Sequence, residues 1–173
     1  MMMGLLHRSP LHRDELTRAP GMFELIQSIA IDAARETASG EAFVPAAHPL
    51  FADHFPGAPL LPGSLLIELA AQIAGPLAEQ VAKHRLEVER WSLLGMIRNA
   101  KFLRPVTLPA ALTFSAAIHR FDSSSIAMLV DASSVGQLVM TAELVMMMFE
   151  AEPGWEAAIR ARRERLAAWK GVA

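Results

Sequence analysis

The sequence predicts one α+β domain in which an antiparallel sheet wraps around a single apolar helix. Three features indicate this class: a proline-rich loop, an apolar run that starts near residue 63, and strand-like segments after residue 91. One helix set among strands is typical of α+β proteins, because the apolar face of an antiparallel sheet needs a helix to cover it. The length of 173 residues also corresponds to one domain.

The chain before the helix is expected to contain an arm, two strands and a loop. Residues 1–21 form an N-terminal arm, because charge and proline are mixed there without periodicity. Two strand-like runs between residues 23 and 44 flank a turn at Ser39 and Gly40. The prolines between residues 42 and 62 fix an irregular loop.

The helix begins at residue 63 or 64, directly after Pro62, and continues at least to Ala74. Pro76 then kinks the helix or ends it before a restart toward Lys83, since proline cannot donate a backbone hydrogen bond.

The later elements are strands and a final helix. Apolar residues alternate with others from residue 112 to 118, and two further strands cover residues 126–132 and 137–150 around a hairpin turn. A C-terminal helix follows from residue 155 to 170. The expected division is an arm at 1–21, a main domain at 22–152 and a C-terminal helix at 153–173.

The composition and the net charge exclude several classes of protein. Hydrophobic residues make up 53% of the chain and charged residues 20%, which excludes a disordered protein. A net charge of −2 lacks the basic excess of a nucleic-acid-binding protein. Without cysteine there is no disulfide and no thiol nucleophile, which fits a cytoplasmic protein. No apolar run reaches the roughly 20 residues that a membrane span needs.

Three polar side chains interrupt the apolar helix. Ser64, Glu68 and Gln72 lie at positions i, i+4 and i+8 and therefore share one face. One interpretation is the solvated face of an ordinary amphipathic helix, and such polar stripes are common. The other is a carboxyl group held in apolar surroundings for chemistry, because one polar residue per turn is narrow for a solvated face.

Histidine supplies the second candidate group. A lone histidine is more often structural or exposed, and no pair has a metal-ligand spacing, so no metal is expected. That interpretation applies to His7, His12, His48, His84 and His119. His54 differs, because a rigid proline-rich loop joins it to the helix that carries Glu68. Such a loop can hold an imidazole toward a carboxyl group with little entropy left to lose.

The segment from His54 to Gln72 resembles a motif of the 3-hydroxyacyl-acyl-carrier-protein dehydratases, the FabA and FabZ family with the hotdog fold. The family pattern HFPGxPxxPGxLxxExxAQ fits this segment, with the same step of fourteen residues from histidine to glutamate. Residues 97–106 resemble the family strand KFRxPV. Glutamate at position 68 is similar to the FabZ-type branch, since FabA-type enzymes carry aspartate there. Asp53, Ser64 and the lack of tyrosine depart from the family and indicate a divergent member.

The resemblance implies dehydration of 3-hydroxyacyl thioesters in fatty-acid or polyketide-type biosynthesis, without a cofactor. It also implies an active site between two subunits, with the histidine of one chain facing the acidic residue of the other. By position, His54 removes the α-proton and Glu68 protonates the departing hydroxyl group. The backbone N–H of Gly63 binds the thioester carbonyl, a role that suits a helix N-terminus. The other implied substrate-binding positions are Phe55, Pro62, Ser64 and Gln72.

The implied partners are an acyl carrier protein with a phosphopantetheine-linked acyl chain and a second copy of the chain. The copies form a homodimer or a trimer of dimers. Carrier proteins are acidic, so docking needs local positive charge, which we expect from Arg98, Lys101 and Arg104. A denser arginine cluster in the last helix is interpreted as a solvated face: Arg160, Arg162, Arg163 and Arg165.

Two other functions remain open. A hotdog protein can act on another acyl thioester as a thioesterase or a hydratase, or it can bind acyl thioesters without catalysis. The presence of both His54 and Glu68 favours an enzyme, since a module that only binds thioesters needs neither.

Overall fold

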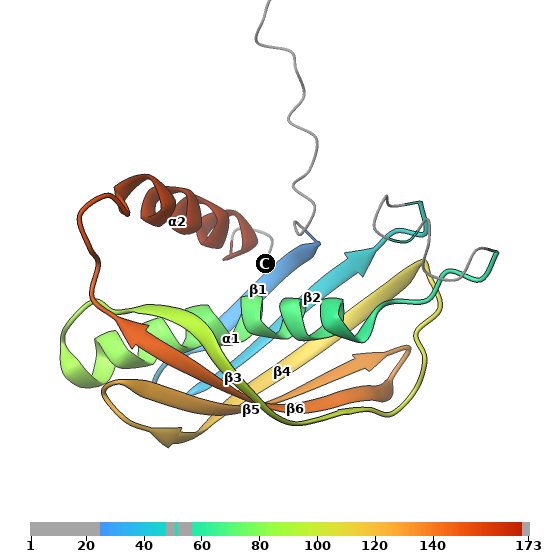
Figure 1. The fold of residues 1–173 in the computed structure, drawn as a ribbon, viewed down its shortest axis with the longest axis horizontal. Helices are drawn as coiled ribbons and strands as arrows, with labels where there is room; N and C mark the ends of the chain where they lie inside the picture. Colours follow the sequence, from blue (N-terminus) through green and yellow to red (C-terminus); the bar gives the residue numbers. More distant parts are fainter. Residues whose placement is uncertain (1–24, 48–50, 52–56, 171–173) are drawn as a thin grey trace, which may run out of the picture.

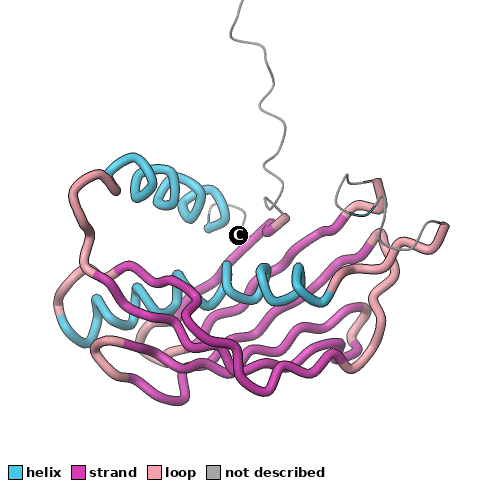
Figure 2. The backbone as a smooth tube through the Cα atoms, viewed as in Figure 1, coloured by secondary structure: helices cyan, strands magenta, loops and turns pink. Residues whose placement is uncertain are grey.

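The computed structural model of the protein describes residues 25–47, 51 and 57–170. One antiparallel sheet curves around helix α1 (Gly63–Leu86), and a second helix, α2 (Glu156–Lys170), lies against the first strand (Figure 1). The strands lie in the order β1-β2-β4-β5-β6-β3. Their bounds are Ile26–Asp32 (β1), Thr37–Val44 (β2), Trp91–Phe102 (β3), Ala110–Phe121 (β4), Ser125–Ser134 (β5) and Gln137–Phe149 (β6). This is the predicted α+β hotdog architecture, with both helices on the concave side of the sheet (Figure 2).

The apolar residues of α1 form the centre of the core, as the sequence predicts. Leu69, Ile73 and Leu77 have no exposed surface and belong to one cluster with apolar residues of the strands. Full burial of such a side chain contributes about 1.5–3 kcal/mol to the free energy of folding. The helix does not end at Pro76 but continues to Leu86, because the buried residues beyond the proline hold its second half in the core.

The predicted turn at Ser39 and Gly40 is wrong, because both residues lie inside β2. The turn lies earlier, where Oδ1 of Asp32 accepts a hydrogen bond of 2.9 Å from the backbone N–H of Arg35. Gly40 is needed within the strand, since a Cβ atom there would clash with Cδ1 of Ile73 on α1. Glycine therefore serves the close approach of strand and helix at this position.

The later strands agree with the predicted pattern. Side chains of β4 alternate between buried and exposed from Ala110 to Ala116. β5 and β6 are joined by a two-residue turn at Val135 and Gly136, whose φ angles of 50° and 72° suit a tight hairpin. β1 and β3 are left as the two edges of the sheet.

The predicted arm, residues 1–21, lies outside the described residues, and the division of the chain into three segments stays a prediction. The final helix is present as α2, although its described residues bury no side chain completely. Neither of the two helices in the described ranges is long and apolar enough to cross a membrane.

Candidate active site

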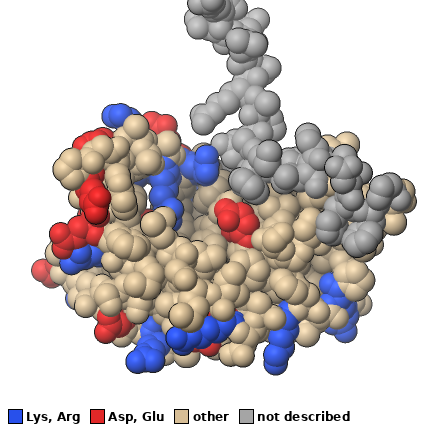
Figure 3. All heavy atoms as spheres, in the orientation of Figure 1, with Lys and Arg blue, Asp and Glu red and all other residues tan. Residues whose placement is uncertain are grey.

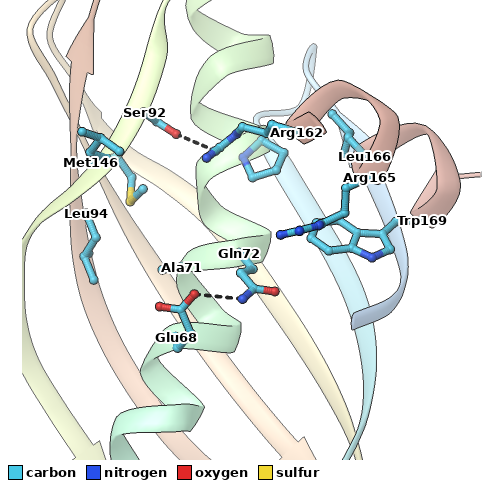
Figure 4. A pocket seen from close by; sticks show the side chains of 12 residues that line it. Glu68, Ala71, Gln72, Ser92, Leu94, Met146, Arg162, Arg165, Leu166 and Trp169 are labelled. Carbon is cyan, nitrogen blue, oxygen red and sulfur yellow. Dashed lines mark hydrogen bonds between the residues drawn. The ribbon is translucent and has the colours of Figure 1, made fainter. Parts of the chain in front are cut away.

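Glu68 and Gln72 open into a pocket of about 190 Å³ between α1 and α2. Both side chains are half-buried, and Nε2 of Gln72 donates a hydrogen bond of 2.8 Å to Oε1 of Glu68 (Figure 4). The two residues lie one turn apart, as their i, i+4 spacing predicts. Oε1 of Gln72 is buried and has no hydrogen-bond partner among the described residues. This arrangement favours a carboxyl group held for chemistry over a solvated stripe.

The remaining walls of this pocket are mainly apolar and come from several elements. Figure 4 shows Leu94 of β3 and Met146 of β6 on one side, and Leu166 and Trp169 of α2 on the other. Charged side chains also face the hollow below α2 (Figure 3), and the arginines that line the pocket are Arg162 and Arg165. Apolar walls with a few convergent polar groups are typical of a site for a small molecule.

A second carboxyl group, that of Glu79, lies further along α1. Its Oε1 accepts a hydrogen bond of 3.0 Å from the backbone N–H of Ser92 and lies 2.9 Å from Nη2 of Arg162. Nη2 of Arg162 also donates a hydrogen bond of 3.2 Å to Oγ of Ser92. Burial raises the pKa of Glu79 above its usual value of 4.5, while the charge of Arg162 and the bonds from Ser92 offset part of that rise. The contacts among Glu79, Ser92 and Arg162 therefore join α2 to the interior of the molecule.

Gly63 begins α1 beside a different hollow, which has a volume of about 420 Å³. The carbonyl of Pro62, the N-cap residue, accepts hydrogen bonds of 3.0 and 3.2 Å from the next turn of the helix. A Cβ atom on Gly63 would lie 2.8 Å from Cζ of Phe102, so a larger residue does not fit without a shift. The free N–H groups at this helix end carry partial positive charge, which suits the binding of a developing oxyanion.

The predicted site residues therefore fall into three groups. Glu68 and Gln72 are brought together, whereas Gly63 lines a separate hollow and Ser64 is exposed. His54 and Phe55 lie outside the described residues, so their predicted roles stay predictions. Among the residues that the structure describes, no group of three or more His, Cys, Asp or Glu side chains could hold a metal ion.

The three residues predicted to dock a carrier protein are exposed; Arg98 and Lys101 lie in the second half of β3, and Arg104 follows the end of the strand. Nη1 of Arg98 lies 3.6 Å from Oε1 of Glu143, and Nη1 of Arg104 donates a hydrogen bond of 2.9 Å to the carbonyl of Leu138. Lys101 lies between them in the sequence, on β3. The basic side chains are thus accessible, although two of them have partners within the chain.

The interpretation of the α2 arginines as a solvated face is wrong for Arg162, whereas Arg163 is exposed as predicted. Arg162 bonds to Glu79, and Arg163 lies 2.8 Å from Glu89 and stacks over Trp91 at 5.5 Å from the ring centroid. The cause is that one face of α2 packs: the half-buried positions are 155, 159, 162, 166 and 169. This helical spacing is a signal in the sequence that could have identified Arg162.

Comparison with known sequences identifies relatives of this chain. Residues 30–130 match the family model described as ApeI-like, the ApeI dehydratase, over more than half of the chain. The 3-hydroxyacyl-[acyl-carrier-protein] dehydratase FabZ of Chlamydia trachomatis serovar L2 is 34% identical over 104 residues, which cover 60% of this chain and 67% of that protein. FabZ of Pseudoalteromonas translucida is 40% identical over 58 residues, or 34% of this chain and 38% of the relative.

Solved structures agree with these relatives about the fold. The dehydratase heterocomplex ApeI:P of Xenorhabdus doucetiae superposes with a TM-score of 0.59 at 17% identity, over 82% of this chain and 90% of that one. A thioesterase of Haemophilus influenzae has a TM-score of 0.53 at 18% identity, over 73% and 82% of the two chains. At these identities the likeness shows the fold alone. The family match over residues 30–130 goes further, and by it the chain belongs to the ApeI-like dehydratase family.

Proposed function

We propose that this protein dehydrates 3-hydroxyacyl thioesters of an acyl carrier protein to trans-2-enoyl thioesters. The observation that carries the proposal is the half-buried carboxyl group of Glu68, which Gln72 holds at a pocket with apolar walls. Membership in a dehydratase family supports the reaction type, and the FabZ relatives are named for this substrate class.

The reaction needs a base for the α-carbon and an acid for the 3-hydroxyl group. His54 takes the α-proton, and the electron pair of the broken C–H bond forms the new double bond. Glu68 gives a proton to the hydroxyl group as the C–O bond breaks, so that water leaves. The N–H of Gly63 binds the thioester oxygen on which negative charge develops. Proton transfer from His54 back to Glu68, directly or through water, restores the enzyme.

A second copy of the chain completes this proposed site. In one chain Glu68 and Gly63 line different hollows, and we infer that a partner subunit joins the two hollows into one site. β3 is an edge strand, and its unpaired backbone groups are accompanied by apolar side chains that are about half exposed: Leu93, Met96, Ile97 and Phe102. We therefore propose a homodimer in which the β3 strands pair and His54 of one chain acts with Glu68 of the other. Trimers of such dimers remain a prediction.

The carrier protein is proposed to dock beside the same strand. Arg98, Lys101 and Arg104 offer exposed positive charge there to an acidic partner. The phosphopantetheine arm would then carry the acyl group from the surface toward Glu68.

The test is to incubate the protein with a 3-hydroxyacyl carrier-protein thioester and to follow the loss of water by mass spectrometry. We expect interconversion with the trans-2-enoyl thioester, and a loss of about 10²–10⁴-fold in kcat for His54→Ala and for Glu68→Gln. The matched controls are His84→Ala and Glu164→Gln, whose exposed side chains lie away from the pocket and should keep the wild-type rate. Release of free carrier-protein thiol without an enoyl product would instead indicate a thioesterase.

A further inference from the structure

α2 forms a wall of the pocket that contains Glu68. It lies beyond the segment that matches the dehydratase family model, yet four of its side chains line this pocket. Those side chains are Arg162, Arg165, Leu166 and Trp169. The part of the chain that adds this helix therefore also changes the shape of the candidate active site.

Four residues on one face of α1 line the pocket. Glu68, Ala71, Gln72 and Pro76 lie at positions i, i+3, i+4 and i+8, so they form one row along the helix. A rise of 1.5 Å per residue gives this row a length of about 12 Å. Glu68 and Gln72 supply the polar groups at one end, and Pro76 lies at the other end, next to Gly75, whose carbonyl accepts a hydrogen bond of 3.0 Å from Oγ of Ser92.

Apolar side chains flank this row on both sides and suit an aliphatic chain, and the polar residues of the lining besides Glu68 and Gln72 are Ser92, Arg162 and Arg165. Leu94 and Met146 come from the sheet, and Figure 4 shows Leu166 and Trp169 reaching from α2 toward α1 on the opposite side. An acyl chain whose 3-hydroxyl group lies at Glu68 has room to run along this row, between the sheet and α2. Burial of each methylene group there contributes about 0.8 kcal/mol.

We propose that α2 closes the acyl pocket and that Trp169 and Leu166 set the longest acyl chain that the enzyme accepts. This proposal rests on the proposed dehydratase function, because it places the substrate's acyl chain in the same pocket. The substrate class that follows is a 3-hydroxyacyl thioester of medium length, whose aliphatic chain contacts these two side chains.

Several contacts hold α2 in place as a wall of the pocket. Arg162 bonds to Glu79 and Ser92, both of which are largely shielded from solvent, while Arg163 pairs with Glu89 and stacks over Trp91. Leu166 and Trp169 also pack against the main hydrophobic core. These contacts fix the position of α2 relative to α1, so Arg162 is a positioning residue for the pocket wall.

The first experiment compares kcat/KM for carrier-protein substrates of four, eight and twelve carbons. Trp169→Ala and Leu166→Ala should raise the ratio of twelve-carbon to eight-carbon activity at least tenfold, since two newly buried methylenes are each worth about fourfold. Trp169→Phe should have a smaller effect. Trp155→Ala is the matched control, because Trp155 precedes α2 and does not line the pocket. An unchanged ratio in folded Trp169→Ala and Leu166→Ala proteins would overturn the proposal.

A second experiment measures occupancy without catalysis. In the Trp91→Phe/Trp155→Phe protein, Trp169 is the only tryptophan left. A saturated acyl-pantetheine with bromine on its terminal carbon should quench Trp169 fluorescence when the chain is of medium length, and much less when it has four carbons. Quenching in a protein that dehydrates no substrate would refute the proposed function but support the proposed acyl pocket. Dehydration of an eight-carbon substrate without quenching would refute the proposal that α2 contacts the acyl chain, but it would support the proposed function.

Discussion

Nη2 of Arg162 on α2 lies 2.9 Å from Oε1 of Glu79 on α1, and this ion pair connects the last helix to the central one. Glu79 is shielded from solvent, whereas the side chain of Arg162 is still 38% exposed. The carboxylate therefore depends on its partner more than the guanidinium does, because a charge removed from water is costly unless it is paired.

Substitution of Arg162 should destabilise the protein. Arg162→Met removes the charged partner of Glu79 and should lower the free energy of unfolding by about 1–3 kcal/mol. Urea denaturation measures this change, with Arg160→Met as the control, because Arg160 is exposed on the same helix. If Arg162→Met and Arg160→Met are equally stable, the ion pair does not hold α2 in solution.

The stability of the protein should depend on pH through Glu79. Burial raises the pKa of Glu79 in the folded protein above its usual value of 4.5, so the folded state binds this proton more tightly than the unfolded state does. The resulting stabilisation is complete below pH 4.5 and is lost as the pH rises through the raised pKa. Between the pKa of the unfolded state and the raised pKa of the folded state, the free energy of unfolding falls by about 1.4 kcal/mol per pH unit.

Glu79→Gln isolates that contribution, since glutamine does not titrate. The free energy of unfolding of the wild type, minus that of Glu79→Gln, should decrease as the pH rises above 4.5 and then become constant. Urea denaturation of both proteins from pH 4 to pH 8 measures this difference. A difference that stays constant, or that increases with pH, would contradict the raised pKa.

Gly63→Ala should impair catalysis more than folding. The added Cβ would lie 2.8 Å from the ring of Phe102, so the first turn of α1 or the ring must shift. A shift of the N–H donor should lower kcat by about 10²–10³-fold, the usual effect of losing an oxyanion donor. Gly63→Ala/Phe102→Leu should recover part of that loss, because the smaller side chain makes room. No recovery in the double variant would show that the contact with Phe102 is not the cause.

An acidic substitution on β3 should disrupt the proposed dimer. Ile97 is 47% exposed on this edge strand, so Ile97→Glu should place a charge in the subunit interface and shift sedimentation toward the monomer. Leu129→Glu is the matched control, because Leu129 is 52% exposed but belongs to β5, which has a neighbouring strand on each side. Dimers of equal stability in the two variants would argue for an interface elsewhere.

The fold could be predicted from the sequence where the pattern is local. Alternation in β4 and the hairpin turn between β5 and β6 each reflect a property of neighbouring residues, and both were confirmed. Gly40 was assigned to a turn because its real constraint, the contact with Ile73, comes from a distant helix.

In the candidate site, too, local patterns could be predicted from the sequence and contacts between distant residues could not. The spacing of Glu68 and Gln72 predicted their shared face, because one helical turn fixes it. The role of Arg162 depends on Glu79 and Ser92, which are far away in the sequence, so composition alone indicated only a charged helix face. The role of His54 stays a prediction.

The weak burial of α2 has a consequence for the dynamics of the molecule. α2 buries no side chain completely, whereas α1 buries Leu69, Ile73 and Leu77 without any exposed surface. Local opening of α2 therefore costs less free energy than global unfolding, and its amide hydrogens should exchange with solvent long before those of α1. Each opening would uncover the pocket beside Glu68 while the sheet stays intact. Frequent openings should then speed the entry and exit of a long acyl chain.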